Sequence, residues 1–288
     1  MSLTDVEQHE IDQANASGLP TVVFIHGLWL LSSSWERWRS LFEQAGYATV
    51  APGWPDDPAT VAEARRDPGV FAHKMIGTVT EHYLDAIGHL SGRPAVVGHS
   101  FGGLIAQKVA GEGASAVTVA IDPAPFRGVL PLPWSALRSS SAVLGNPANV
   151  GRAVALTYEQ FKFGWANNLT DDEAHQLYEE FHVPASGAPI FQAATANLNP
   201  WTEAKVDTDN PDRGPLQIIA GQADHTVPLA ITRAMYDQQQ SNSSPTSIVE
   251  IPDRGHSLTI DSGWATVAQT ALAFVEEHPA RLGGRGAG

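Results

Sequence analysis

The chain has 288 residues, of which 43% are hydrophobic and 17% charged, and no shift in composition marks a linker. These values are typical of a globular chain with a large core, and we expect one domain. The formal net charge is −14 and the 17 basic residues form no run, which argues against nucleic acid or an anionic membrane as partner. The chain has no cysteine, which excludes disulfides, thiolate metal sites and a cysteine nucleophile.

The two ends of the chain carry no sign of secretion or of membrane insertion. Residues 1–20 are polar and lack the basic and apolar regions of a secretory signal. No apolar run reaches the ~20 residues that span a bilayer. We therefore expect a cytoplasmic protein without a membrane partner, and we predict that the glycine-rich residues 281–288 form a flexible tail.

Short apolar runs rich in β-branched residues alternate with helix-like stretches along the chain. This alternation predicts an α/β fold with a mostly parallel central sheet and helices on both faces, since strands buried on both faces are apolar throughout. The predicted helices lie near residues 33–45, 73–90, 101–111, 229–239 and 264–277. The predicted strands are TVVFI (21–25), ATVA (48–51), AVVG (95–98), AVTVAI (116–121), LQIIA (216–220) and SIVEI (247–251).

One interval breaks this alternation. More than ninety residues without a convincing strand separate Ile121 from Leu216, far more than an ordinary crossover needs. We predict an insertion over residues 124–212 and a core built from residues 21–123 and 213–280. Thr170 and Glu173 form the pattern of a capping box, followed by an apolar stripe at helical spacing, so we expect the insertion to be helical.

The stretch GHSFGG (98–103) places a serine between glycines where a strand-like run turns into a helix-like pattern. A serine in a sharp strand-to-helix turn adopts strained backbone angles, and neighbouring glycines let other backbone approach without a clash. Such a turn holds the hydroxyl out at the carboxyl edge of the sheet. Ser100 is therefore a candidate nucleophile.

A serine hydroxyl needs a base to remove its proton, and the base needs a third group to fix its tautomer. His256 follows the last predicted strand, and Asp224 follows the strand before it. The carboxyl ends of parallel strands meet at one edge of a sheet, so these side chains are expected near Ser100. Asp122 also follows a strand and is the alternative acid, although we favour Asp224.

The segments FIHG, GHSFGG, GQADHTVP and PDRGHS, in this order and on these elements, resemble the α/β-hydrolase superfamily. The resemblance extends from Thr21 to about His278 and implies that fold. It assigns Ser100 as nucleophile, His256 as general base and then acid, and Asp224 as the orienting carboxylate. It also implies an oxyanion hole made by the backbone N–H groups of Phe101 and Leu28, with Trp29 as a second candidate for the latter.

The resemblance also bears on the two segments that flank the core. Only about twenty polar residues precede the first predicted strand, so the antiparallel strand pair with which the family usually begins is expected to be shortened or missing. The insertion stands where the family carries its cap, and its aromatic residues are expected partly to pack it on the sheet and partly to line a pocket. The proposed pocket residues are Trp29, Phe126, Trp134, Phe161 and Trp165.

Together these features predict a cofactor-free serine hydrolase that acts on a neutral, largely apolar ester or lactone through an acyl-enzyme. Carbon–carbon bond hydrolysis and perhydrolase or haloperoxidase-like chemistry use the same triad and stay open. A small-molecule binding or signalling homologue is the alternative outside enzymes. None of the eleven histidines falls into a metal-binding spacing, so no metal or cofactor is expected. The sequence leaves the oligomeric state open.

Overall fold

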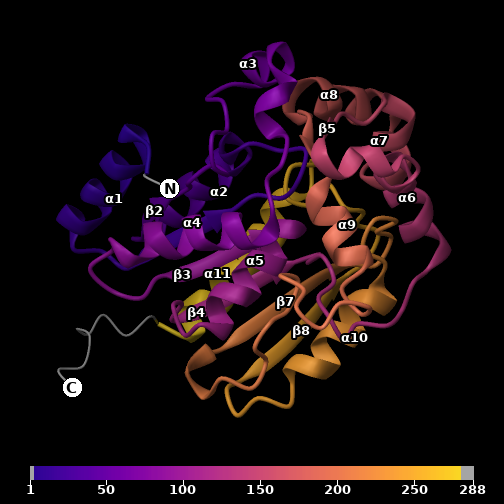
Figure 1. Ribbon diagram of the computed structural model, residues 1–288. Coiled ribbons are helices and arrows are strands. Elements are labelled where there is room, and N and C mark those ends of the chain that lie inside the picture. Colours follow the sequence, from indigo (N-terminus) through magenta and orange to yellow (C-terminus); the bar gives the residue numbers. More distant parts are fainter. Residues whose placement is uncertain (1–2, 280–288) are drawn as a thin grey trace.

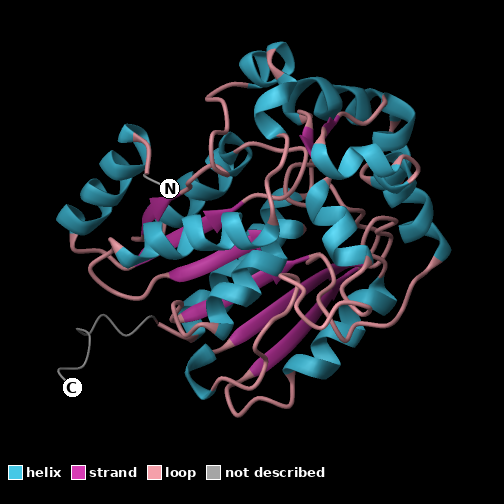
Figure 2. Ribbon diagram, viewed as in Figure 1, coloured by secondary structure: helices cyan, strands magenta, loops and turns pink. Residues whose placement is uncertain are grey.

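The computed structural model describes residues 3–279, and its centre is one sheet of six parallel strands with helices on both faces (Figures 1 and 2). The strand order is β2-β1-β3-β4-β7-β8. These strands are β1 (Thr21–Ile25), β2 (Ala48–Val50), β3 (Ala95–His99), β4 (Val117–Ile121), β7 (Leu216–Gly221) and β8 (Thr246–Ile251).

The predicted α/β fold is confirmed, because each of the six predicted runs forms one of these strands. The five predicted helices are also present, with ends that differ by up to three residues. They are α2 (Glu36–Gln44), α4 (Ile76–Gly88), α5 (Phe101–Gly111), α10 (Leu229–Gln239) and α11 (Trp264–Glu277). The predicted flexible tail lies outside the described residues.

The strands are buried on both faces, and successive side chains enter two different cores. In β1, Val22 and Phe24 pack in the core beneath α2 and α11, whereas Val23 and Ile25 pack in the core that includes α4 and α5. This alternation follows from the two-residue period of a strand. Because both faces are covered, the apolar runs carry no polar positions, which is why they could be recognised in the sequence.

A helix that the sequence analysis did not predict, α1 (Asp5–Ser17), packs against the edge strand β2. Thr4 and Glu7 form its capping box, and the Glu10 carboxylate accepts a hydrogen bond of 3.0 Å from the Ala51 N–H just beyond β2. The helix therefore covers an edge that would otherwise be open to another strand.

All strand pairs of the described six-stranded sheet are parallel, which agrees with the expectation that the antiparallel pair is shortened or missing.

The segment between β4 and β7 is mainly helical. It contains α6 (Trp134–Leu144), α7 (Tyr158–Gly164), α8 (Asp171–Phe181) and α9 (Ala188–Ala194), which gather beside the sheet in Figure 1. The prediction missed a two-stranded antiparallel pair, β5 (Ala153–Val154) and β6 (Ala185–Ser186), because two residues carry no periodic signal. The prediction also missed the short helix α3 (Val61–Arg66), which precedes α4 along the chain.

Thr170 caps α8 as predicted, since its side chain accepts from the Glu173 N–H. The predicted reciprocal bond is replaced by another: the Glu173 carboxylate accepts from the Ser262 N–H at 2.8 Å. Glu173 thus ties the inserted segment to the loop that follows β8. Within residues 3–279, no helix combines the length and the apolar character needed to cross a bilayer.

Candidate active site

Ser100 occupies a strained turn between β3 and α5. Its backbone angles are φ 56° and ψ −123°, a region that residues other than glycine rarely adopt. The turn is held by hydrogen bonds on both sides, because the Ser100 N–H donates to the Ile121 carbonyl at 2.9 Å and the Ser100 carbonyl accepts from the N–H groups of Leu104 and Ala124. The surrounding structure therefore fixes the strain at this residue.

Two glycines next to Ser100 are required by close approach of the backbone. A Cβ atom on Gly98 would lie 2.1 Å from the Gly102 carbonyl oxygen, and a Cβ on Gly102 would lie 2.1 Å from the Ile25 carbonyl oxygen. Any side chain at either position would force β1, β3 and α5 apart. The glycines of the GHSFGG segment therefore let the helix start directly on top of the sheet, with Ser100 at its N-terminal end.

Ser100, His256 and Asp224 form one continuous hydrogen-bonded chain. His256 Nε2 lies 2.9 Å from Ser100 Oγ, and His256 Nδ1 lies 2.6 Å from Asp224 Oδ2. A carboxylate can only accept, so Nδ1 carries the proton and Nε2 presents its lone pair to the serine hydroxyl. All three residues are buried. This is the arrangement that activates a serine as a nucleophile.

Two further aromatic side chains contact His256, one at its backbone and one at its imidazole. His99 Nε2 lies 2.9 Å from the His256 carbonyl oxygen, and the Trp165 ring stands nearly perpendicular to the His256 ring at 4.7 Å. Burial lowers the pKa of His99 well below its ordinary value, and the neighbouring His256 lowers it further. His99 is therefore neutral and donates its single N–H to the backbone of His256, the predicted base.

The loop after β1 passes directly beside Ser100. A Cβ on Gly27 would lie 2.8 Å from the Ser100 Cβ, which shows how closely the two segments approach. Neither the Leu28 N–H nor the Phe101 N–H donates to a backbone acceptor within residues 3–279. Trp29 has a positive φ of 62°, and its indole N–H donates to the Val154 carbonyl at 2.9 Å. The loop is thus anchored to the inserted segment as well as to the core.

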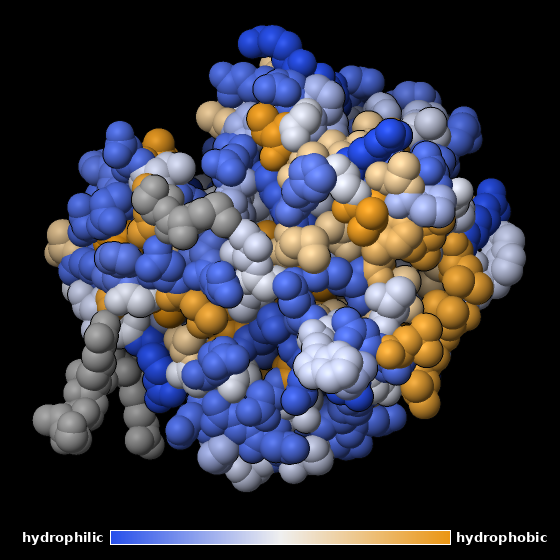
Figure 3. All heavy atoms as spheres, in the orientation of Figure 1, coloured by the Kyte–Doolittle hydropathy of each residue, from blue (hydrophilic) through white to orange (hydrophobic). Residues whose placement is uncertain are grey.

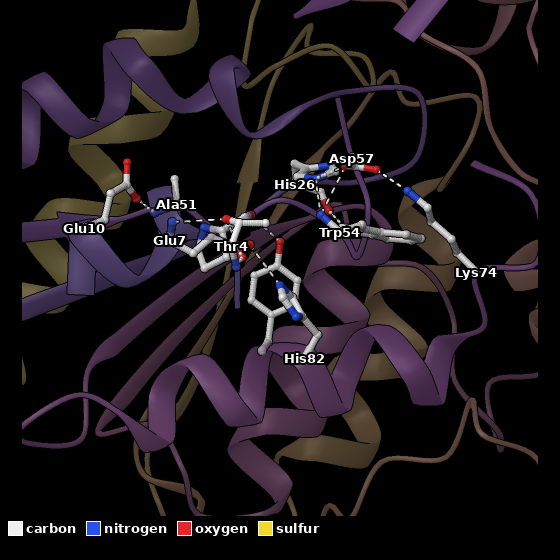
Figure 4. A network of polar contacts seen from close by, with 11 residues as sticks. Thr4, Glu7, Glu10, His26, Ala51, Trp54, Asp57, Lys74 and His82 are labelled. Atoms are coloured by element: carbon white, nitrogen blue, oxygen red, sulfur yellow. Dashed lines mark hydrogen bonds and ion pairs between the residues drawn. The ribbon is translucent and has the colours of Figure 1, made fainter. Parts of the chain in front are cut away.

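A buried polar network braces this loop from the side of the core (Figure 4). The Trp54 indole N–H donates to the His26 carbonyl at 3.1 Å, and His26 Nδ1 lies 2.9 Å from the Gly27 carbonyl. On the other side of the ring, His26 Nε2 lies 3.1 Å from the Asp57 carboxylate, which also forms an ion pair with Lys74. The sequence analysis did not identify Asp57 or Lys74, because nothing in their local sequence marks them as partners of His26.

A cavity of about 220 Å³ opens at Ser100 beneath the inserted segment. Trp29 and Phe126, two of the five proposed pocket residues, line it together with the predicted oxyanion residue Phe101. None of the described residues that line it carries a charge, and most are apolar. Such a site favours a neutral, apolar ligand, because burial of a charge without a partner costs free energy.

The other three proposed pocket residues lie elsewhere. Phe161 and Trp165 are 1% exposed and stack on each other at 5.8 Å in the core of the inserted segment. Trp134 is 67% exposed in the first turn of α6, where its ring stands nearly perpendicular to that of Phe163 at 6.2 Å. None of the three lines the cavity at Ser100. Aromatic composition alone could not separate side chains that pack the insertion from those that line a cavity.

A second cavity, of about 470 Å³, lies between α1 and residues 51–59. Charged side chains line much of it, including Glu10, Arg39 and Asp57, and no member of the serine triad reaches it. Several of its charges are already paired, as in the 2.7 Å ion pair between Arg39 and Glu10. Size alone therefore does not make it the reactive site.

Comparison with known proteins agrees with this geometry. The sequence model of the alpha/beta hydrolase family matches residues 22–270. The chain belongs to this family. Family membership and the hydrogen-bonded Ser100–His256–Asp224 chain identify the protein as a serine hydrolase. A search of curated protein sequences finds no match to this α/β-hydrolase.

Solved structures share the fold of this α/β-hydrolase at low sequence identity. A monoacylglycerol lipase from Paleococcus ferrophilus is 21% identical with a TM-score of 0.61, over 90% of this chain and 94% of the other. A pyrethroid hydrolase from Sphingobium faniae is 19% identical with a TM-score of 0.60, over 91% and 98%. A methylesterase from Arabidopsis is 15% identical with a TM-score of 0.59, over 90% and 99%.

The network around His26 generates a testable prediction. Lys74→Met removes the cation that balances the buried Asp57 carboxylate, so we expect a loss of ~3–5 kcal/mol in the free energy of unfolding and a lower kcat, as the loop beside Ser100 loses its brace. Adding Asp57→Asn to Lys74→Met removes the uncompensated charge and should restore most of the stability. Urea unfolding of both variants tests this. A double variant that is less stable than Lys74→Met would contradict it.

Proposed function

We propose that this α/β-hydrolase cleaves a neutral, largely apolar carboxylic ester or lactone through an acyl-enzyme on Ser100, without a cofactor. The observation that carries the proposal is the uncharged cavity that opens directly at the hydrogen-bonded Ser100. The three structural neighbours described above are named a lipase, a hydrolase of pyrethroids and a methylesterase. Their names agree with ester chemistry.

In the proposed reaction, Ser100 Oγ attacks the carbonyl carbon while its proton passes to His256 Nε2. Asp224 stabilises the imidazolium that forms and holds Nδ1–H in place. The carbonyl oxygen, on which negative charge develops, accepts hydrogen bonds from the N–H groups of Leu28 and Phe101. Each such donor lowers the free-energy barrier of the reaction by about 3 kcal/mol. His256 then gives its proton to the leaving alcohol, and a water molecule activated by the same residue releases the acid.

The substrate enters, in this proposal, between the inserted residues 124–212 and the sheet. Leu130, Leu132 and Leu137 line the cavity and are also 78%, 67% and 44% exposed, so they connect the cavity to the surface. Figure 3 shows an apolar area over α6 and the chain that leads into it. An apolar acyl or alkyl chain that extends beyond the cavity would therefore continue over apolar side chains and not over charged ones.

The central test is hydrolysis of p-nitrophenyl esters of increasing acyl length. Ser100→Ala should fold normally, because the alanine removes only the hydroxyl, yet lower kcat by a factor on the order of 10⁴ to 10⁶. Circular dichroism confirms the fold, and release of p-nitrophenol gives the rate. Unchanged turnover in Ser100→Ala would contradict the proposal.

The acyl-length profile tests the entrance. We expect Leu132→Ser to raise KM several-fold for long acyl chains and to leave acetyl esters unaffected, because each buried methylene contributes ~0.8 kcal/mol only if the chain reaches this residue. Leu19→Ser is the matched control, since Leu19 is also exposed but lies beyond α1 and does not line the cavity. Equal effects of the two variants, or an effect of Leu132→Ser on acetyl esters, would argue against an entrance at this place.

A further inference from the structure

A second buried carboxyl group lies beside the triad. Asp122 follows β4 with a positive φ of 37°, and its side chain is completely buried. Carboxylate oxygens of Asp122 and Asp224 and a ring nitrogen of His256 all lie within 4.8 Å of one another. The sequence presented Asp122 and Asp224 as alternatives for the acid, but the fold brings both to the same base.

The hydrogen bonds around the two carboxyl groups are unequal. Asp224 Oδ1 accepts from the N–H groups of Thr226 and Val227 at 2.6 and 2.9 Å, and its Oδ2 accepts from His256. Asp122 Oδ1 accepts one bond, of 2.8 Å from the Gly221 N–H, and its Oδ2 meets no donor within the described chain. Hydrogen bonds to a carboxylate favour its charged form, so the charge belongs on Asp224.

Two adjacent buried carboxylates cannot both ionise at low cost, because like charges repel strongly away from water. Burial raises the pKa of Asp122 well above its ordinary value, and the negative charge of Asp224 raises it further. A proton on Asp122 Oδ2 would turn the oxygen without a donor into a donor itself. Its natural acceptor is the neighbouring Asp224 carboxylate.

We propose that Asp122 is a positioning residue of the triad: it keeps its proton, donates a hydrogen bond through that O–H to the Asp224 carboxylate, and becomes the charged partner of His256 when Asp224 loses its charge. The proposal rests on the serine-hydrolase function described above. The strained backbone of Asp122 agrees with it, because residues held at positive φ collect at active sites. The space is also restricted, since a Cβ on the facing Gly221 would lie 3.1 Å from Asp122 Oδ2.

The proton can be observed without any turnover. Infrared difference spectra between wild type and Asp122→Asn, at neutral pH, should show the C=O stretch of a protonated carboxyl group that the variant lacks. Asp261→Asn is the matched control, because Asp261 is another buried carboxyl group but is paired with Arg254 at 3.2 Å. The band assigned to Asp122 should persist in Asp261→Asn and in Ser100→Ala. If the C=O band of a protonated carboxyl group were absent from wild type, or equally strong in Asp122→Asn, the proposal would be overturned.

A double-mutant cycle on kcat/KM tests the second role. Asp122→Asn alone replaces the O–H donor to Asp224 with a weaker N–H donor, so we expect kcat/KM to fall by about threefold. Asp224→Asn should cost about 10²-fold, less than the ~10⁴-fold loss typical of a triad whose only acid is removed, because Asp122 then ionises beside His256. Adding Asp122→Asn to Asp224→Asn should bring the loss to about 10⁴-fold.

The charge on Asp122 has a second signature in the pH profile. In Asp224→Asn the acid limb of kcat/KM should stay near that of wild type, because one negative charge still faces His256. In the double variant that charge is gone, so the acid limb should move to lower pH. If Asp122→Asn changed kcat/KM by the same factor in wild type and in Asp224→Asn, the proposal would be overturned. If instead Ser100→Ala kept full turnover, the serine-hydrolase function would fail while the infrared result would stand.

Discussion

The strained turn at Ser100 is the constraint on which the rest of the site depends. A serine at φ 56° is held here by backbone hydrogen bonds to Ile121, Leu104 and Ala124, in a turn where α5 and the loop after β1 closely approach the backbone of β3. This closeness excludes side chains at Gly98 and Gly102 and holds the hydroxyl at the carboxyl edge of the sheet. The same edge delivers Asp224 after β7 and His256 after β8, so parallel strand order alone brings three distant residues together.

The segment between β4 and β7, which the sequence predicts to be an insertion, contacts the site on the side away from the sheet. Trp165 packs on the imidazole of His256, and the Val154 carbonyl holds the indole of Trp29 in the loop beside Ser100. This segment therefore contacts both His256, the proposed base, and the loop proposed to bind the oxyanion, in addition to covering the cavity. A change in the packing of this segment is therefore expected to alter kcat as well as substrate binding.

The six strands and the three residues of the hydrogen-bonded chain could be predicted from the sequence. The six strands stand out because burial on both faces makes them apolar throughout, and Ser100, Asp224 and His256 stand out because each follows a strand in a turn rich in glycine or proline. What could not be predicted depends on contacts between distant residues. The polar helix α1 is stabilised by packing on the edge of β2, and the pairing of His26 with Asp57 and Lys74 exists only after folding. For the same reason, the sequence could not show that Trp165 packs on His256 or that Asp122 lies beside Asp224.

The account depends most directly on Ser100 being an activated nucleophile, and covalent labelling measures this without knowledge of the natural substrate. The protein is incubated with an apolar alkyl fluorophosphonate, and its intact mass and peptide masses are then determined. We predict one adduct per chain, located on the peptide that contains Ser100, and none in Ser100→Ala. A wild-type protein that acquires no adduct, or a Ser100→Ala variant labelled to the same extent, would contradict the account.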